Sequence, residues 1–181
     1  DATAIIFGGG RPSAWGLSDG VKERITDYVK KGGKFLGVCA GAYFVSKQSC
    51  FTISHENSKH SRFHGVDLFQ GKAYGPVYSG ITQENYLTTR GAIASDIVHS
   101  WGDAREEGKV YYQGGCSFSP IEGQGPVPYE EIASYRIGNG TLPAIIGCKF
   151  ERGAYVLVGP HLEFSWPEVY TYPDPNPNLE N

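Results

Sequence analysis

The sequence contains no methionine, no long apolar run and no excess of basic residues. Its longest apolar stretches are strand-sized, well short of the ~20 residues of a membrane-spanning helix, so no membrane partner is expected. Lys and Arg number 16 against 19 Asp and Glu, for a net charge of -3. Because a phosphate backbone is bound through clustered Lys and Arg, nucleic acid is not an expected partner either.

The absence of methionine extends to position 1, where Asp1 directly precedes an apolar run. This start suggests a chain whose native beginning, including a signal peptide, has been removed. Asn139-Gly140-Thr141 fits the acceptor pattern for N-glycosylation and lies in a glycine-rich turn. The two features favour the secretory pathway, with the cytoplasm as the alternative.

Cysteine is scarce, with four residues in the chain. Two disulfides could connect them in ~3 ways, and one disulfide with two free thiols is also open. If Cys39 is a nucleophile it must remain reduced. Cys50, Cys116 and Cys148 are then an odd set, so one of them is free or pairs outside the chain.

With 181 residues and 40% hydrophobic content, the chain has the size of one domain, which we place at residues 1–170. Residues 171–181 alternate proline with turn formers, which cannot build a strand ladder. We expect an extended tail there. Short apolar runs alternate with amphipathic stretches before it, which is typical of an α/β domain.

The first 45 residues predict a strand, a helix, a second strand and a second helix. The amphipathic segment between the two strands has a capping residue at its start and Gly32-Gly33 at its end, so it predicts a crossover helix between parallel strands. Later segments predict strands, a helix at 129–135, and a hairpin. The expected ranges are strands 3–7, 34–38, 51–54 and 110–113, helices 18–31, 39–45 and 129–135, and hairpin strands 142–150 and 154–158.

Gly37-Val38-Cys39-Ala40-Gly41 fits the pattern of a nucleophile on a tight turn between a strand and a helix. Glycine two residues either side avoids a clash of Cβ with neighbouring backbone. The start of the following helix also favours a thiolate. The alternative is that Cys39 is a small buried residue in a tight packing contact, which is common for cysteine.

His161-Leu162-Glu163 supplies an imidazole and a carboxylate two residues apart, which face the same side of an extended segment. Together with Cys39 they form a candidate catalytic triad. Backbone N–H groups of Gly9 or Gly10 and of Ala40 could form an oxyanion hole. The alternative is an ordinary histidine at a strand end beside a surface glutamate.

The other histidines are His55, His60, His64 and His99. His60 and His64 are four residues apart and could share a helix face, with His55 nearby. Their segment is not convincingly helical, however, and no cysteine or carboxylate pair completes a ligand set. We interpret them as surface histidines and predict neither a metal nor another cofactor.

The elbow at 37–44 and Gly-Pro-His-Leu-Glu-Phe at 159–164 resemble the amidotransferase-like domain at the N-terminus of eukaryotic biotin-protein ligases, within the class I glutamine amidotransferase-like superfamily. The segments 7–10, 111–115 and the stretch 133–135, expected as helix, occur in the order of this family. The resemblance covers roughly residues 3–165. It implies a flavodoxin-like three-layer α/β/α sandwich with a mostly parallel sheet and a site at the carboxyl ends of the strands. The expected site residues besides the triad are Gly9, Gly10, Ala40, Tyr43, Gly114 and Gly115.

Two departures from the family pattern matter. Glutamine amidotransferases usually carry Gln two residues after the second elbow glycine, where this chain has Tyr43, so this position does not favour glutamine as the substrate. The family also has a strand, a helix and a further strand before the segment that matches 3–7. Since parallel sheets are normally covered on both faces, we expect another chain, a further segment or a local replacement to supply that part.

Three functions follow from these residues. The first is a cysteine amide hydrolase or amidotransferase-like enzyme acting on a small-molecule or amide-containing substrate. The second is a catalytically silent binding protein whose pocket is lined by aromatic residues such as Tyr43, Tyr112 and Trp101. The third is a redox protein in which Cys39 and Cys116 exchange a disulfide.

Overall fold

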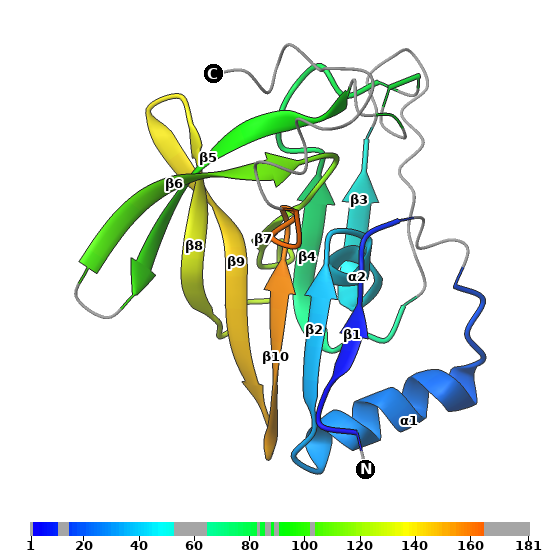
Figure 1. Ribbon diagram of the computed structural model, residues 1–181. Coiled ribbons are helices and arrows are strands. Elements are labelled where there is room, and N and C mark those ends of the chain that lie inside the picture. Colours follow the sequence, from blue (N-terminus) through cyan, green and yellow to red (C-terminus); the bar gives the residue numbers. More distant parts are fainter. Residues whose placement is uncertain are drawn as a thin grey trace.

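A curled, mixed sheet of seven strands organises the chain (Figure 1). The computed structural model describes residues 2–10, 15–52, 65–82, 84–85, 88, 91–101 and 104–164. The predicted tail at 171–181 and His55, His60 and His64 therefore lie outside the described residues. In spatial order the strands are β1 (Ile5–Phe7), β2 (Lys34–Val38), β10 (Gly153–Val158), β9 (Gly140–Phe150), β8 (Glu130–Ile137), β5 (Ile93–Trp101) and β6 (Ala104–Tyr112).

The first βαβ unit forms as the sequence predicts. Helix α1 (Asp19–Lys30) follows the extended residue Ser18 and buries Ile25 and Val29, and β1 pairs parallel with β2 in the register Ile6 to Leu36. Asp19 in the first turn and Lys30 in the last both suit the helix dipole. The chain then passes directly from β2 into the short helix α2 (Ala40–Phe44).

The expectation of a mostly parallel, flavodoxin-like sandwich is wrong. Only β1–β2 and β2–β10 are parallel among the pairs of the described seven-stranded sheet, and β10–β9, β9–β8, β8–β5 and β5–β6 are antiparallel. Antiparallel neighbours need no crossover helix, so the described part of the chain forms few helices. Helices α1 and α2 both pack on the same face of the sheet. Figure 1 shows β5 and β6 turning across the ends of β8 and β9 instead of continuing the sheet flat.

The segment 129–135, expected as a helix, is a strand. Its residues form β8, which pairs with β9 on one side and β5 on the other. A bulge between Glu131 and Ser134 breaks the pairing register and leaves three consecutive buried residues, Ala133 to Tyr135. The bulge removes the alternation of exposed and buried residues that identifies a strand in a sequence.

A small second sheet packs beside α2. Its strands are β3 (Ser46–Phe51), β4 (Phe69–Gly75) and β7 (Ser117–Ser119), in the order β3-β4-β7. Of the predicted strand at 51–54, Phe51 is the last residue of β3 and residues 53–54 lie outside the described residues. The predicted strand at 110–113 is the end of the much longer β6. The hairpin at 142–158 is confirmed as β9 and β10.

Two hydrophobic cores lie on opposite faces of the large sheet. The first is built around Phe35, Phe44, Phe69 and Leu157 and includes buried side chains of both α1 and α2. The second is built around Val38, Ile97, Tyr112 and Ile145, where β5 and β6 fold over the sheet. Cys39 belongs to the second core, while Tyr43 and Phe44 of α2 belong to the first. The elbow therefore lies between the two cores, at the carboxyl end of β2.

Strand β1 forms one edge of the large sheet, and Ile6 on it is 65% exposed. A partner segment or chain along this edge remains a prediction. Among the described residues, no helix has the length and apolar character required to traverse a membrane.

Candidate active site

Four strands that run in the same direction bring the candidate site together. The parallel pairs place β1, β2 and β10 in one direction, and the alternating antiparallel pairs from β10 to β6 give β6 that direction too. The sheet curls so that the end of β6, its last strand, comes next to the segment after β10. A hydrogen bond from the His161 N–H to the Tyr111 carbonyl, at 2.9 Å, joins the two. The segments after these four strands therefore meet at one edge.

Cys39 stands on a strained turn between β2 and α2. Its φ of 48° and ψ of -106° lie in a region that L-residues rarely adopt, which is typical of a nucleophile elbow. Its N–H donates to the Val158 carbonyl at 2.7 Å, and the Gly41 N–H donates to the Gly8 carbonyl at 3.2 Å. The elbow is thus tied to both neighbouring strands, β10 and β1.

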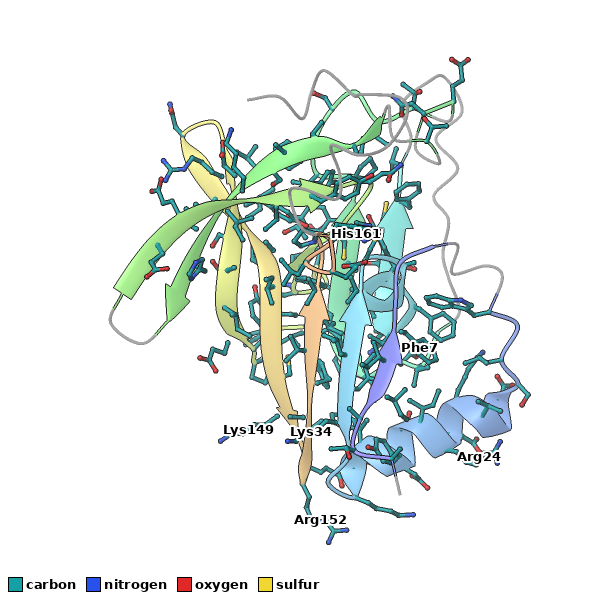
Figure 2. The ribbon with its side chains drawn as sticks, viewed as in Figure 1. Phe7, Arg24, Lys34, Lys149, Arg152 and His161 are labelled. Atoms are coloured by element: carbon teal, nitrogen blue, oxygen red, sulfur yellow. The ribbon has the colours of Figure 1, made fainter. Side chains whose placement is uncertain are left out.

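The glycine at position 41 is required by close backbone contact. A Cβ there would lie 2.2 Å from the Phe7 carbonyl oxygen and 2.8 Å from its carbon, and both are backbone atoms. The sequence predicts a clash of such a Cβ with neighbouring backbone, and the structure identifies that backbone as the end of β1, which packs against α2. Figure 2 shows Phe7 on β1, whose ring packs against Phe35 and Phe44 of the first core.

His161 lies just beyond the end of β10, and Lys34, Lys149 and Arg152 lie at the opposite end of the strands (Figure 2). Its Nδ1 lies 2.7 Å from Oε1 of Glu163, so Nε2 is the nitrogen left for Cys39. Burial alone would lower the pKa of His161, but hydrogen bonds with Cys39 and Glu163 and the charges of both groups raise it to about 10. The structure thus brings the three predicted triad residues together.

Glu163 orients the imidazole from the solvent side. Burial alone would raise the pKa of its carboxyl, but the hydrogen bond from His161, a backbone hydrogen bond and the imidazolium charge lower it below 4.5. Tyr111 and Phe164 pack their rings against the imidazole, with centroid distances of 5.8 Å and 5.6 Å. The imidazole is therefore held on its edges and faces as well as at Nδ1.

The glycine loop after β1 borders the imidazole directly. A Cβ on Gly9 would lie 2.5 Å from Cε1 of His161, so only glycine permits this approach. Gly10 follows with a positive φ of 132°. Ala40 is the first residue of α2, whose N–H has no acceptor within the helix.

The loop after β6 forms the opposite wall. The Cys39 thiol donates to the Gln113 carbonyl at 3.8 Å, a contact that the sequence did not reveal. Gly114 and Gly115 follow Gln113 in this loop. Tyr43, expected at the pocket, is 2% exposed and lies beneath the loop, where its hydroxyl donates to the Gly114 carbonyl.

All four cysteines are free thiols in the structure. Burial raises the pKa of Cys116 well above 9, and the charge of Cys39 acts in the same direction, so Cys116 stays protonated near neutral pH. Asn139 lies in the exposed turn between β8 and β9, and its glycosylation stays a prediction. His99 lies 3.7 Å from Glu106, across β5 and β6 and away from the triad.

The His161–Glu163 pair predicts a pH window for stability. The raised pKa of His161 gives stabilisation that is complete below about 6.5 and lost as pH rises through about 10. The lowered pKa of Glu163 gives stabilisation that is complete above 4.5 and lost at more acid pH. Glu163→Gln should therefore lower the free energy of unfolding most between about pH 4.5 and 6.5, with the loss fading on both sides.

Urea unfolding from pH 3 to 10.5 measures this difference between wild type and Glu163→Gln. Glu122→Gln, which changes an exposed glutamate in a turn, serves as the control. A difference that stays constant over the whole range would contradict the linkage.

Comparison with known proteins finds relatives over most of the chain. The family model for the N-terminal part of biotin-protein ligase matches residues 1–179. An uncharacterized protein of Chlamydia muridarum is 33% identical over 141 residues, or 78% of this chain and 52% of that protein. A biotin-protein ligase of Schizosaccharomyces pombe is 31% identical over 164 residues, or 89% of this chain and 25% of the ligase. This chain thus spans about half of one relative and a quarter of the other.

Among solved structures, a GH42 β-galactosidase from G. stearothermophilus aligns with a TM-score of 0.50 over 88% of this chain and 19% of its own. The sequence identity is 10%, so the similarity concerns the fold alone. The family match extends over nearly the whole chain. The chain therefore belongs to the family of biotin-protein ligase N-terminal domains.

Proposed function

We propose that this domain is a cysteine-dependent amide hydrolase or amidotransferase-like enzyme of the class I glutamine amidotransferase-like superfamily. The observation that carries the proposal is the strained Cys39 on its elbow beside an imidazole that is itself held by Glu163. The yeast relative is named a biotin-protein ligase, but this chain matches a quarter of it. We therefore base the proposal on the site and not on that name.

The proposed reaction begins when the Cys39 thiolate attacks the carbonyl carbon of a carboxamide. The carbonyl oxygen becomes an oxyanion, and the N–H groups of Ala40 and of the loop at Gly9 and Gly10 are its proposed donors. Protonated His161 gives its proton to the leaving amine, and a thioester forms at Cys39. A water or an amine then attacks the thioester, His161 takes its proton, and the thiolate is restored.

The residue at position 43 affects which substrate is expected. Its hydroxyl is turned to the Gly114 carbonyl beneath the loop, so its side chain offers no amide group to the pocket. The position therefore lacks the polar amide that glutamine amidotransferases carry there. We expect ammonia release from carboxamides other than free glutamine. The assay uses a panel of carboxamides that includes glutamine as the reference.

The alkylation of Cys39 by iodoacetamide at different pH values tests the proposal. An ordinary thiol is about 1% thiolate at pH 6.5, because its pKa is about 8.5. An active site thiolate should instead react at a nearly constant rate down to pH 6.5, as measured by mass spectrometry of the Cys39 peptide. Ammonia release from the panel should disappear in Cys39→Ala.

Other outcomes would favour the other functions. Slow alkylation of Cys39 with the pH dependence of an ordinary thiol, together with no ammonia release, would contradict the enzyme and favour a catalytically silent binding protein. A Cys39 that reacts only after a reductant is added would favour the redox function with Cys116. The free thiols of the structure and the protonated state of Cys116 support the enzyme over the redox protein.

A further inference from the structure

Three buried tyrosines hold the loop that faces the Cys39 sulfur. They come from α2, β6 and β8, and each donates its hydroxyl proton to one of three consecutive carbonyls. The hydrogen bonds are Tyr43 to Gly114 at 3.1 Å, Tyr112 to Gly115 at 2.8 Å and Tyr135 to Cys116 at 3.1 Å.

The hydroxyls can act only as donors to these carbonyls over the accessible pH range. Burial raises the pKa of all three tyrosines well above 10, so each keeps its proton. A buried carbonyl without a donor is costly, so each of the three carbonyls is fixed toward its tyrosine. Three fixed peptide groups in succession determine where the preceding carbonyl, that of Gln113, stands.

The Gln113 carbonyl stands against the sulfur of Cys39, at 3.8 Å. A carbonyl oxygen accepts a hydrogen bond from a thiol but repels a thiolate, so it favours the neutral form. His161, backed by Glu163, acts in the opposite direction. Among the residues that the structure describes, the other titratable groups that interact electrostatically with Cys39 are Tyr43, Tyr112, Tyr135 and Cys116, which carry no charge near neutral pH.

We infer that Tyr43, Tyr112 and Tyr135 are positioning residues that hold the Gln113 carbonyl against Cys39 and so restrain thiolate formation. The inference rests on the proposed function in taking Cys39 as the reactive thiol. The loop and the imidazole then set the reactivity of the thiol from opposite sides. Release of the loop makes the thiolate easier to form.

Tyr43→Phe tests the inference because it removes one hydroxyl and keeps the ring. The midpoint of the pH curve of Cys39 alkylation should fall by about 0.5 pH unit, the shift expected for one modest hydrogen bond. Tyr112→Phe should shift it in the same direction. Hydrogen exchange at the amides of Gly114 and Gly115 should become faster in both variants.

Tyr155→Phe is the matched control. Tyr155 is also buried, and its side chain is hydrogen-bonded to that of Cys148. It lies near the start of β10, away from Cys39. It should lose stability without any shift in the alkylation midpoint. Circular dichroism establishes that each variant is folded, and Tyr135→Phe replaces either variant that is not.

An unchanged or higher midpoint in folded Tyr43→Phe and Tyr112→Phe would overturn the inference. So would unchanged exchange of the loop amides. The proposed function fails separately, if His161→Ala leaves the alkylation curve of Cys39 as it is in wild type. In that case the tyrosine variants would still shift the midpoint.

Discussion

His161→Ala is expected to slow the alkylation of Cys39 at pH 7 by about 100-fold. The imidazole is the cationic partner that favours the thiolate, and a positioned acid or base typically contributes at least that factor. Its pKa, raised to about 10 by the contacts with Cys39 and Glu163, keeps it protonated at this pH. The loss should shrink above about pH 9, where an isolated thiol ionises without help.

The measurement is the second-order rate of iodoacetamide labelling, followed on the Cys39 peptide from pH 5.5 to 10. His99→Ala is the matched control, because His99 also lies near a glutamate, Glu106, but on β5 and away from the elbow. It should label as wild type does. Equal rates for His161→Ala and wild type at pH 7 would show that the imidazole does not activate the thiol.

Gly41→Ala is expected to lower the free energy of unfolding by about 3 kcal/mol, the upper part of the usual range for overpacking. The new Cβ would lie 2.2 Å from the Phe7 carbonyl oxygen, and neither backbone can yield without separating β1 from α2. The movement would also break the hydrogen bond from the Gly41 N–H to Gly8. Because the elbow is displaced, alkylation of Cys39 should also follow the pH dependence of an ordinary thiol.

Urea unfolding measures the change, with Gly20→Ala as the control. Gly20 lies in α1, and a Cβ there meets no atom within 4 Å. This substitution should raise the free energy of unfolding by up to about 1 kcal/mol, because alanine is the better helix former. A Gly41→Ala protein as stable as wild type would show that β1 is not packed on the elbow as described.

The sequence predicted the parts of the fold that local patterns specify. The spacing of Val21, Ile25 and Val29 identifies α1, and the glycines at its end mark the turn into β2. The hairpin of β9 and β10 follows from two apolar runs split by a short turn that ends in Gly153. These elements depend on neighbours in the chain, so their residues contain the information.

The arrangement of the rest depends on contacts between distant segments. Glu130, Glu131 and Ala133 are compatible with a helix, but β5 and β9 on either side supply hydrogen bonds that only a strand can use. Strand β5 carries Asp96 and His99 among its apolar residues and offers no simple periodicity. The mixed order of the sheet therefore could not be read from the chain.

The site divides in the same way. Cys39 between two glycines, and a histidine two residues from a glutamate, are local patterns, so these side chains could be named from the sequence. The Gln113 carbonyl and the three tyrosine hydroxyls could not, because a backbone acceptor has no residue signature and a buried tyrosine looks like any other core residue. The contact of Tyr43 with the loop after β6 depends on the packing of α2 against that loop, which only the structure shows.

The gathering of the site from the ends of four strands has a consequence for the newly made protein. Cys39 leaves the ribosome well before Gln113, and His161 emerges near the end of the described domain. A nascent, truncated or misfolded chain thus carries a thiol with neither its activating base nor its restraining carbonyl. Under the proposed function, the activated state of this cysteine therefore arises only after β10, the last strand of the sheet in the sequence, is in place.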